Sequence, residues 1–128
     1  TIPIRDALRG IVGEGIAGLS AAMPELADLD RQVLRQPWSE VRDNCTALAQ
    51  RLGNVLQHGS VLEGPEEVHA WREEIRYAFG HAAEALESWI DRIAAGEETG
   101  VCLMGEMKLR PKLMDLSSLL TRIDRELV

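Results

Sequence analysis

Three side chains that could bind a metal ion lie close together in the sequence: Glu66, His69 and Glu73. On a helix they occupy positions i, i+3 and i+7 and could face one ion. A Glu-x-x-His pair is half of the ligand set of a di-iron helical bundle, which also needs a second such pair and two glutamates from facing helices. The sequence offers no second pair. We therefore predict a solvated acidic face here, with no metal site and no cofactor.

His81 is the single residue whose surroundings most suggest chemistry. On a helix it lies away from the apolar positions, on a face with Glu74, Tyr77, Glu84, Ala85 and Ser88. Its small neighbours leave the imidazole open to a partner's aspartyl phosphate. Histidine phosphotransfer domains, however, generally carry a lysine three residues after the histidine, followed by glycine. Here these positions hold Glu84 and Ala85, and a carboxylate repels a phosphoryl group. A phosphotransfer-type signalling bundle with His81 as phosphoacceptor is therefore the alternative to a solvated surface histidine.

A G-x-G-x-x-G motif lies near the start of the chain, at Gly13, Gly15 and Gly18, after Ile11 and Val12. These twelve or so residues resemble the nucleotide-binding turn of dinucleotide-binding flavoproteins. That turn works only between a buried strand and a helix, within a parallel sheet. Here the preceding residues have the spacing of a helix, a proline follows shortly after, and every later segment has helical spacing. We therefore predict that the motif lies within a helix and binds no dinucleotide.

The same helix has a second property, because its small residues Gly10, Gly13, Ala17 and Ala21 fall along one side. A side without bulk lets another backbone come close, either from the same chain or from a second copy. Each interior glycine also costs up to about 1 kcal/mol of helix stability, so residues 1–23 should depend on packing. These four residues are candidate interaction residues. Trp38, beside a proline at a helix start, is a further candidate, because tryptophan is enriched in binding hot spots.

The elements that carry these residues are helices with narrow apolar seams. Residues 37–57, 65–95 and 111–127 repeat apolar side chains every three or four positions, which predicts helices packed at shallow angles. The predicted seams are Val41, Cys45, Leu48, Leu52 and Val55; Val68, Trp71, Ile75, Ala78, Ala82, Leu86, Trp89 and Ile93; and Leu113, Leu116, Leu120, Ile123 and Leu127. We predict an all-α bundle of four to five helices, mostly antiparallel, in a single domain over residues 1–128.

The breaks between helices follow from proline, glycine and the loss of period. Residues 3–23 and 24–35 form two helices, with a kink or break just before Pro24. Helix ends are expected at His58-Gly59 and at Gly96. A helix over 65–95 is long for this domain, so it should bend near Gly80 or project past its neighbours. Residues 96–110 lack a helical period, and we expect an irregular segment there, either a short hairpin or a structured loop.

Charge and composition narrow the classes of partner. The net charge is −7, which disfavours nucleic acid and anionic membranes. No apolar run approaches the about 20 residues of a membrane span. Cys45 and Cys102 have no metal-type spacing; two free thiols in the cytoplasm are expected, and a disulfide between them stays open.

The sequence therefore predicts a cytoplasmic, non-catalytic protein–protein interaction domain: a regulatory domain, an adaptor or a small subunit, which could also self-associate. Two alternatives remain. One is the phosphotransfer bundle with His81, and the other is a helical bundle that binds a small apolar ligand.

Overall fold

The regular apolar spacing produces helices along almost the whole chain. The computed structural model describes residues 4–59 and 69–127. In chain order the elements are α1 (Ile4–Ala27), α2 (Leu29–Arg35), α3 (Trp38–Gly59), α4 (His69–Ala95), α5 (Glu98–Met104), the π-helical turn η2 (Gly105–Leu109) and α6 (Arg110–Leu127). These residues contain no strand. The prediction of an all-α bundle is confirmed.

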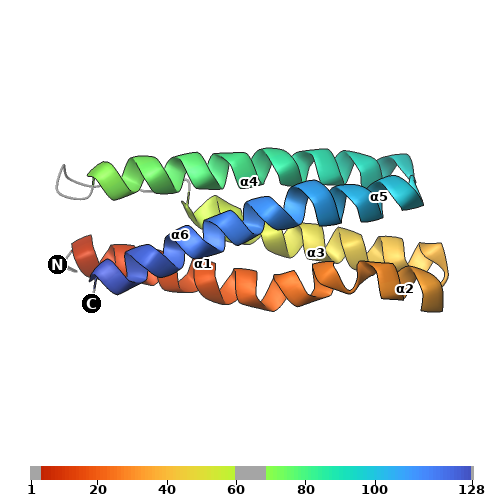
Figure 1. The fold of residues 1–128 in the computed structure, drawn as a ribbon, viewed down its shortest axis with the longest axis horizontal. Coiled ribbons are helices and arrows are strands. Elements are labelled where there is room, and N and C mark those ends of the chain that lie inside the picture. The colour runs from red at the N-terminus through yellow and green to blue at the C-terminus, as the bar shows by residue number, and fades with distance from the viewer. Residues whose placement is uncertain (1–3, 60–68, 128) are drawn as a thin grey trace.

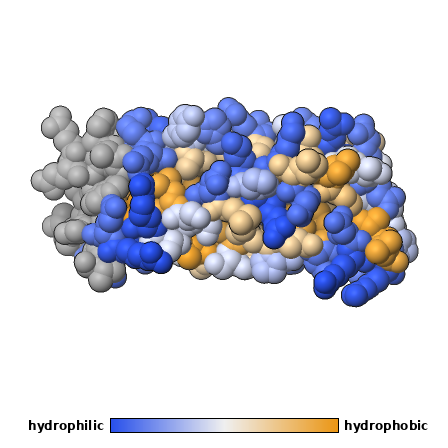
Figure 2. Space-filling model, in the orientation of Figure 1, coloured by the Kyte–Doolittle hydropathy of each residue, from blue (hydrophilic) through white to orange (hydrophobic). Residues whose placement is uncertain are grey.

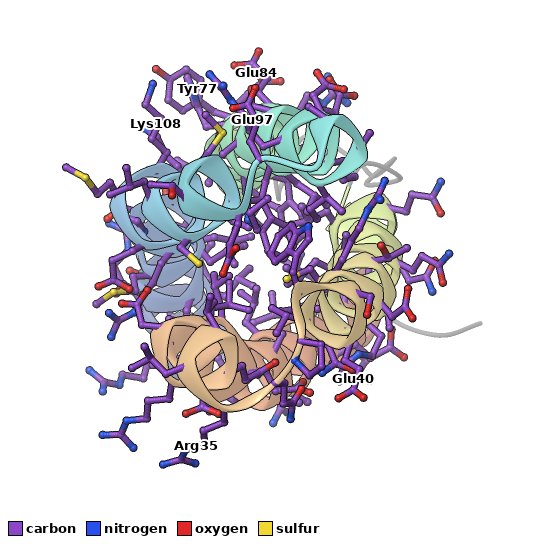
Figure 3. The ribbon with its side chains drawn as sticks, turned by 90° about the vertical axis from the view of Figure 1, so that its right-hand side faces the viewer. Arg35, Glu40, Tyr77, Glu84, Glu97 and Lys108 are labelled. Atoms are coloured by element: carbon purple, nitrogen blue, oxygen red, sulfur yellow. The ribbon has the colours of Figure 1, made fainter. Side chains whose placement is uncertain are left out.

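The helices form four antiparallel rods (Figure 1). Two rods are single helices, α3 and α4. The other two are composite: α1 continues into α2, and α5 continues through η2 into α6. α1 packs against α3 and α6, and α4 packs against the same two helices. α1 and α4 therefore lie on one diagonal of the bundle, and α3 and α6 on the other, as the end-on view shows (Figure 3).

The predicted seams form the core. The buried seam residues are Val41, Cys45, Leu48 and Leu52 on α3, Ile75, Ala82, Leu86, Trp89 and Ile93 on α4, and Leu113, Leu116, Leu120 and Ile123 on α6. Val55 and Ala78 are half-buried beside them, and Phe79, outside the predicted seam, is also buried. Val68 and the side chains of Trp71 and Leu127 lie outside the described part. No polar or charged residue is buried among the residues described.

The break predicted before Pro24 is wrong. α1 continues through Pro24 to Ala27, and the interruption falls at Asp28. Proline removes the amide that would bond the carbonyl of Ser20, four residues earlier. Ser20 and Pro24 are both exposed, so water can reach this carbonyl and the helix persists. The chain turns only after Pro24, where the Asp28 amide donates to the carbonyl oxygens of Pro24 (3.1 Å) and Glu25 (3.3 Å).

The irregular segment and hairpin predicted over 96–110 are also wrong. Gly96, with a φ of +71°, ends α4 as predicted, but the chain is helical again from Glu98. The buried residues Val101, Gly105, Leu109 and Leu113 follow one another at intervals of four, which drifts out of phase with a 3.6-residue period. The wider π-helical turn absorbs this drift and keeps all four on the core side.

The long helix α4 runs without interruption through Gly80. It extends beyond the Gly59 end of α3, whereas α1 and α6 also run to that end of the bundle (Figure 1). The expectation that this helix projects past its neighbours therefore holds for α3 but not for α6.

Candidate functional site

A groove runs along the surface where α4 meets η2 and the first turn of α6. Its volume is about 400 Å³, and it is lined by His81, Glu84, Ala85 and Ser88 from α4 and by Met104, Met107, Lys108, Pro111 and Lys112 from the facing rod. Figure 3 shows Tyr77, Glu84 and Lys108 pointing outward on this side of the bundle. The groove thus joins the predicted candidate His81 to residues far away in the sequence.

A buried hydrogen bond joins α4 to the rod that carries the facing wall of the groove. The indole Nε1 of Trp89 on α4 donates to the carbonyl oxygen of Val101 on α5, at 3.0 Å. The backbone amide of Gly105 donates a bifurcated hydrogen bond to the carbonyl oxygens of Cys102 and Val101. A Cβ atom on Gly105 would lie 3.2 Å from Trp89 Nε1 and 3.3 Å from Leu26 Cδ1. Glycine is therefore the residue that lets α4 and the π-helical turn pack this closely.

The π-helical turn and the helices on either side of it, α5 and α6, expose apolar side chains. Met107 is 70% exposed, Leu103 and Met114 are about half exposed, and Met104 is half-buried. Figure 2 shows apolar surface over α5 and η2, interrupted by charged side chains. Methionine side chains are flexible and polarisable, and they adapt to the shape of a partner. π-Helical turns also occur frequently at functional sites.

The groove carries charged side chains on both sides. Lys108 and Lys112 lie one helical turn apart on one side, and Glu84 lies on the other. In the described part of the chain none of the three makes an ion pair, although nearby Arg110 pairs with Glu106 at 2.8 Å. Two ammonium groups and one carboxylate therefore remain available to a ligand or partner.

His81 lies half-buried in this groove. Its ring meets the ring of Tyr77 edge-on, with the centroids 4.2 Å apart and the planes at 69°. Neither ring nitrogen makes a hydrogen bond within residues 4–59 and 69–127. Of the predicted face, His81, Glu84, Ala85 and Ser88 form one wall of the groove, whereas Glu74 and Tyr77 do not line it. The sequence did not reveal Lys108 and Lys112, because their proximity depends on the packing of two helices distant in the chain.

The predicted small-residue stripe on α1 is open. Gly10, Gly13, Ala17 and Ala21 are all exposed, and a Cβ on Gly10 or Gly13 would meet nothing within 4 Å. The close approaches within the chain are made instead by Gly15 and Gly18. A Cβ on Gly15 would lie 2.8 Å from Leu120 Cδ1, and one on Gly18 would collide with Val55. Contact of the stripe with another chain stays a prediction.

Trp38 does not stand out from the surface. It is half-buried at the start of α3 and packs against the core. The strongly exposed apolar side chains are elsewhere; among them are Leu34 (88% exposed), Tyr77 (71%) and Met107. A tryptophan at a helix start therefore indicated an exposed apolar side chain less well than did the loss of helical period in the segment that contains Met107.

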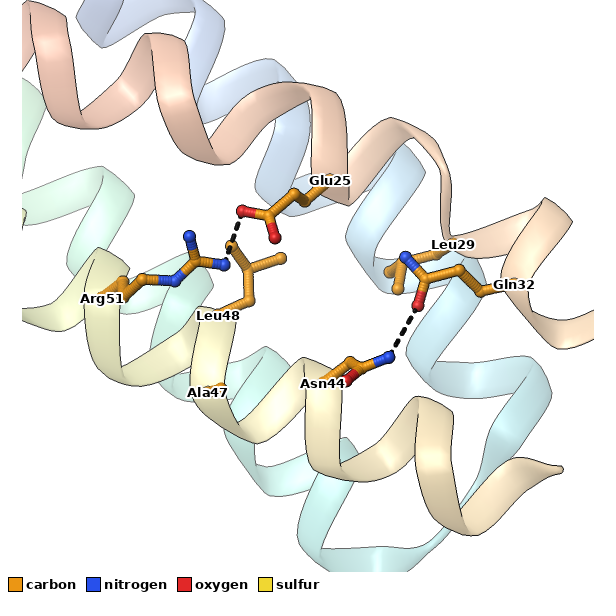
Figure 4. Close-up of a pocket in the computed structure, with 7 residues that line it drawn as sticks. All are labelled: Glu25, Leu29, Gln32, Asn44, Ala47, Leu48 and Arg51. Atoms are coloured by element: carbon orange, nitrogen blue, oxygen red, sulfur yellow. Dashed lines mark hydrogen bonds and ion pairs between the residues drawn. The ribbon is translucent and has the colours of Figure 1, made fainter. Parts of the chain in front are cut away.

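A second hollow, between α1–α2 and α3, is bridged by its own side chains (Figure 4). Arg51 pairs with Glu25, and the Asn44 side-chain amide donates to Gln32 Oε1 at 3.3 Å. Leu29, Ala47 and Leu48 complete its lining. Its polar groups are thus engaged in joining the two rods, unlike those of the α4–η2 groove.

The remaining candidates do not assemble into a site within the described residues. Glu66 and the side chain of His69 lie outside the described part, and Glu73 is exposed. No group of three or more His, Cys, Asp or Glu side chains elsewhere in that part could hold a metal ion. Gly13, Gly15 and Gly18 lie inside α1, as predicted. Cys45 is buried, Cys102 is half-buried, and both are free thiols.

Comparison with protein-family models, with curated proteins and with solved structures found no match. None of the helices in the described ranges combines the length and the apolar character needed to cross a membrane. The groove is accordingly the feature from which a function can be argued.

Proposed function

We propose that this chain is a non-catalytic protein–protein interaction domain, and that an amphipathic helix of a partner protein binds in the α4–η2 groove. The observation that carries the proposal is the joint exposure of Met107, Lys108 and Lys112 along one groove, where neither lysine forms an ion pair with the described residues. A regulatory domain, an adaptor or a small subunit would each use such a surface. The two free thiols are in keeping with a cytoplasmic location.

The shape of the groove favours a helix as the occupant. It is bounded by two helical rods and has apolar side chains from Ala85, Met104, Met107 and Pro111. A helix that presents apolar residues at i, i+3, i+4 and i+7 buries them in such a groove and leaves its polar face in water. The flexible methionines can adjust to the anchors of that helix.

The charges of the groove indicate which charged side chains the partner helix carries. Lys108 and Lys112 are one turn apart, so acidic side chains one turn apart along the same edge of the incoming helix would pair with both. A second copy of this chain is a less favourable occupant, because each copy carries a net charge of −7 and the copies repel one another.

The proposal is tested by selecting binders from a displayed library of amphipathic helical peptides that vary in charge along one edge. We expect selected peptides to carry acidic residues on one edge and to bind more weakly as salt rises. Met107→Asp should weaken their binding at least about tenfold, because it places a carboxylate among the apolar anchors. Leu34→Asp is the matched control: Leu34 is even more exposed, lies on α2 away from the groove, and its substitution should leave binding unchanged.

Three results would overturn the proposal. Failure to enrich any peptide above background would remove the docking function. Binding that is equal in Met107→Asp and the unsubstituted chain would place the contact elsewhere. Self-association that disappears in Met107→Asp would assign the groove to a second copy. Circular dichroism of both variants confirms that the helices are retained.

A bundle that binds a small apolar ligand is less well supported than docking. Such a ligand needs a concave, largely enclosed cavity. The hollows described above open to the surface between helices, and the core is filled by apolar side chains.

A further inference from the structure

The α4–η2 groove brings a nucleophile and two cations together. His81 on α4, Lys108 on η2 and Lys112 on α6 line the same hollow. We propose that His81 is a phosphoryl-acceptor site, and that Lys108 and Lys112 bind the oxygens of the incoming phosphoryl group. This goes beyond the docking of a partner helix, and its test does not require any such helix.

The imidazole is suited to accept the group. A neutral imidazole has one ring nitrogen with a free lone pair. Neither nitrogen of His81 is engaged by a hydrogen bond in the described part of the chain, so this lone pair is available. The edge-on ring of Tyr77, 4.2 Å away between centroids, limits the orientations of the imidazole. A positioned nucleophile loses less entropy on reaching the transition state.

The lysines supply the positive charge that α4 lacks. The transferred phosphoryl group spreads its negative charge over three oxygens, and catalysis of its transfer is mainly positioning and charge stabilisation. An ammonium group stabilises these oxygens as a point charge. Three residues after His81, where a lysine on the same helix would stabilise these oxygens, the sequence has Glu84. The fold provides the cations from the opposite wall instead.

The carboxylate of Glu84 repels the incoming phosphoryl group and should slow its transfer to His81. This carboxylate lines the same hollow and has no cationic partner within the described residues. Two lysines against one glutamate leave one net positive charge to meet the phosphoryl group. Removing the carboxylate should therefore speed the transfer, whereas removing the lysines should slow it.

The step can be written with phosphoramidate as the donor. The lone pair of an imidazole nitrogen attacks phosphorus, a new P–N bond forms, and the P–N bond of the donor breaks. Ammonia leaves and takes up the proton that the other ring nitrogen releases. The hollow opens at the surface, and its volume of about 400 Å³ leaves space for so small a donor beside the imidazole.

The experiment incubates the full chain with phosphoramidate and follows intact mass and phosphorus NMR. We expect one phosphoryl group, labile in acid and stable in alkali, which is absent in His81→Gln and retained in His58→Gln. The double variant Lys108→Ala with Lys112→Ala should be labelled about tenfold more slowly, as expected for the loss of a charge-assisted contact. The double variant Lys108→Arg with Lys112→Arg keeps both positive charges and should therefore keep most of the labelling rate. Glu84→Gln should be labelled faster than the unsubstituted chain.

The site assignment is overturned if His81→Gln is labelled as fast as the unsubstituted chain, or if no label is incorporated. The role of the lysines is overturned if their double Ala variant reacts at the unsubstituted rate with circular dichroism unchanged. Because phosphoramidate labelling needs no protein partner, a failure here leaves the docking proposal standing, and a failure to select peptides leaves this proposal standing.

Discussion

Among the described residues, Cys45 has the ionisation that the fold disfavours most strongly. It is fully buried on α3. Burial, and to a smaller extent the charge of Cys102, raises the pKa of the Cys45 thiol to about 11 from an ordinary value of 9.0. The folded protein thus keeps this proton at pH values where the unfolded chain has lost it.

The raised pKa predicts a loss of stability in alkali. Below about pH 9 both states hold the proton and the stability contribution is complete. As the pH rises from about 9 to about 11, only the unfolded chain loses the proton, so the free energy of unfolding falls by up to about 3 kcal/mol. Denaturant unfolding of the natural chain and of Cys45→Ala across this range measures the difference. Parallel pH profiles for the two proteins would contradict the prediction.

At the scale of elements, the π-helical turn depends on close packing around Gly105. A methyl group there would lie 3.2 Å from Trp89 Nε1, and Trp89 is held in place by its bond to Val101. Trp89 can yield only by weakening that bond, so a larger residue at position 105 must strain the junction between α4 and η2.

We therefore predict that Gly105→Ala destabilises the protein by about 1–3 kcal/mol, the usual cost of overpacking. Gly13→Ala is the matched control, because a Cβ there meets nothing within 4 Å. It should instead stabilise the protein by up to about 1 kcal/mol through helix propensity. Chemical denaturation measures both. If Gly105→Ala stabilises the protein, the side chains around the turn can shift to accommodate a methyl group, and the prediction is wrong.

At the scale of the whole molecule, apolar seams hold four rods together, and no charged residue is buried in the described ranges. The ion pairs in the described part are exposed, for example between Glu74 and Arg122, and exposed pairs contribute little. The relative alignment of the rods is fixed instead by specific contacts: the Trp89–Val101 hydrogen bond and the close approaches at Gly15, Gly18 and Gly105.

The rods should differ in local stability. α1 contains four glycines and Pro24 but buries Leu8, Val12, Leu19 and Leu26. Because interior glycines weaken a helix, we predict that amides of residues 8–23 exchange with solvent faster than those of 41–56 on α3. Native-state hydrogen exchange measures this. Equal protection would mean that packing against α3 and α6 fully offsets the glycines.

The parts of the fold that were predictable are those set by local spacing. Alternating intervals of three and four placed Leu48 and Leu116 in the core, and Gly96 marked the end of a helix. The π-helical turn was not predictable in this way, because intervals of four do not match the 3.6-residue period of an α-helix. The packing of Gly105 against Trp89 joins two helices and leaves no local pattern in the sequence. The same holds for the candidate site: His81 was visible in the sequence, but Lys108 and Lys112 joined it only through the packing of α4 against the last rod.

The π-helical turn also affects the length of the polypeptide. A turn of this kind holds one residue more than the α-helical turn that it replaces. Between Val101 and Leu113 the chain is therefore one residue longer than an uninterrupted helix between the same packing layers would be. A protein built on the same rods with a straight final helix would align with this sequence through a single-position gap within 105–109, and its seams on both sides would then superimpose in phase.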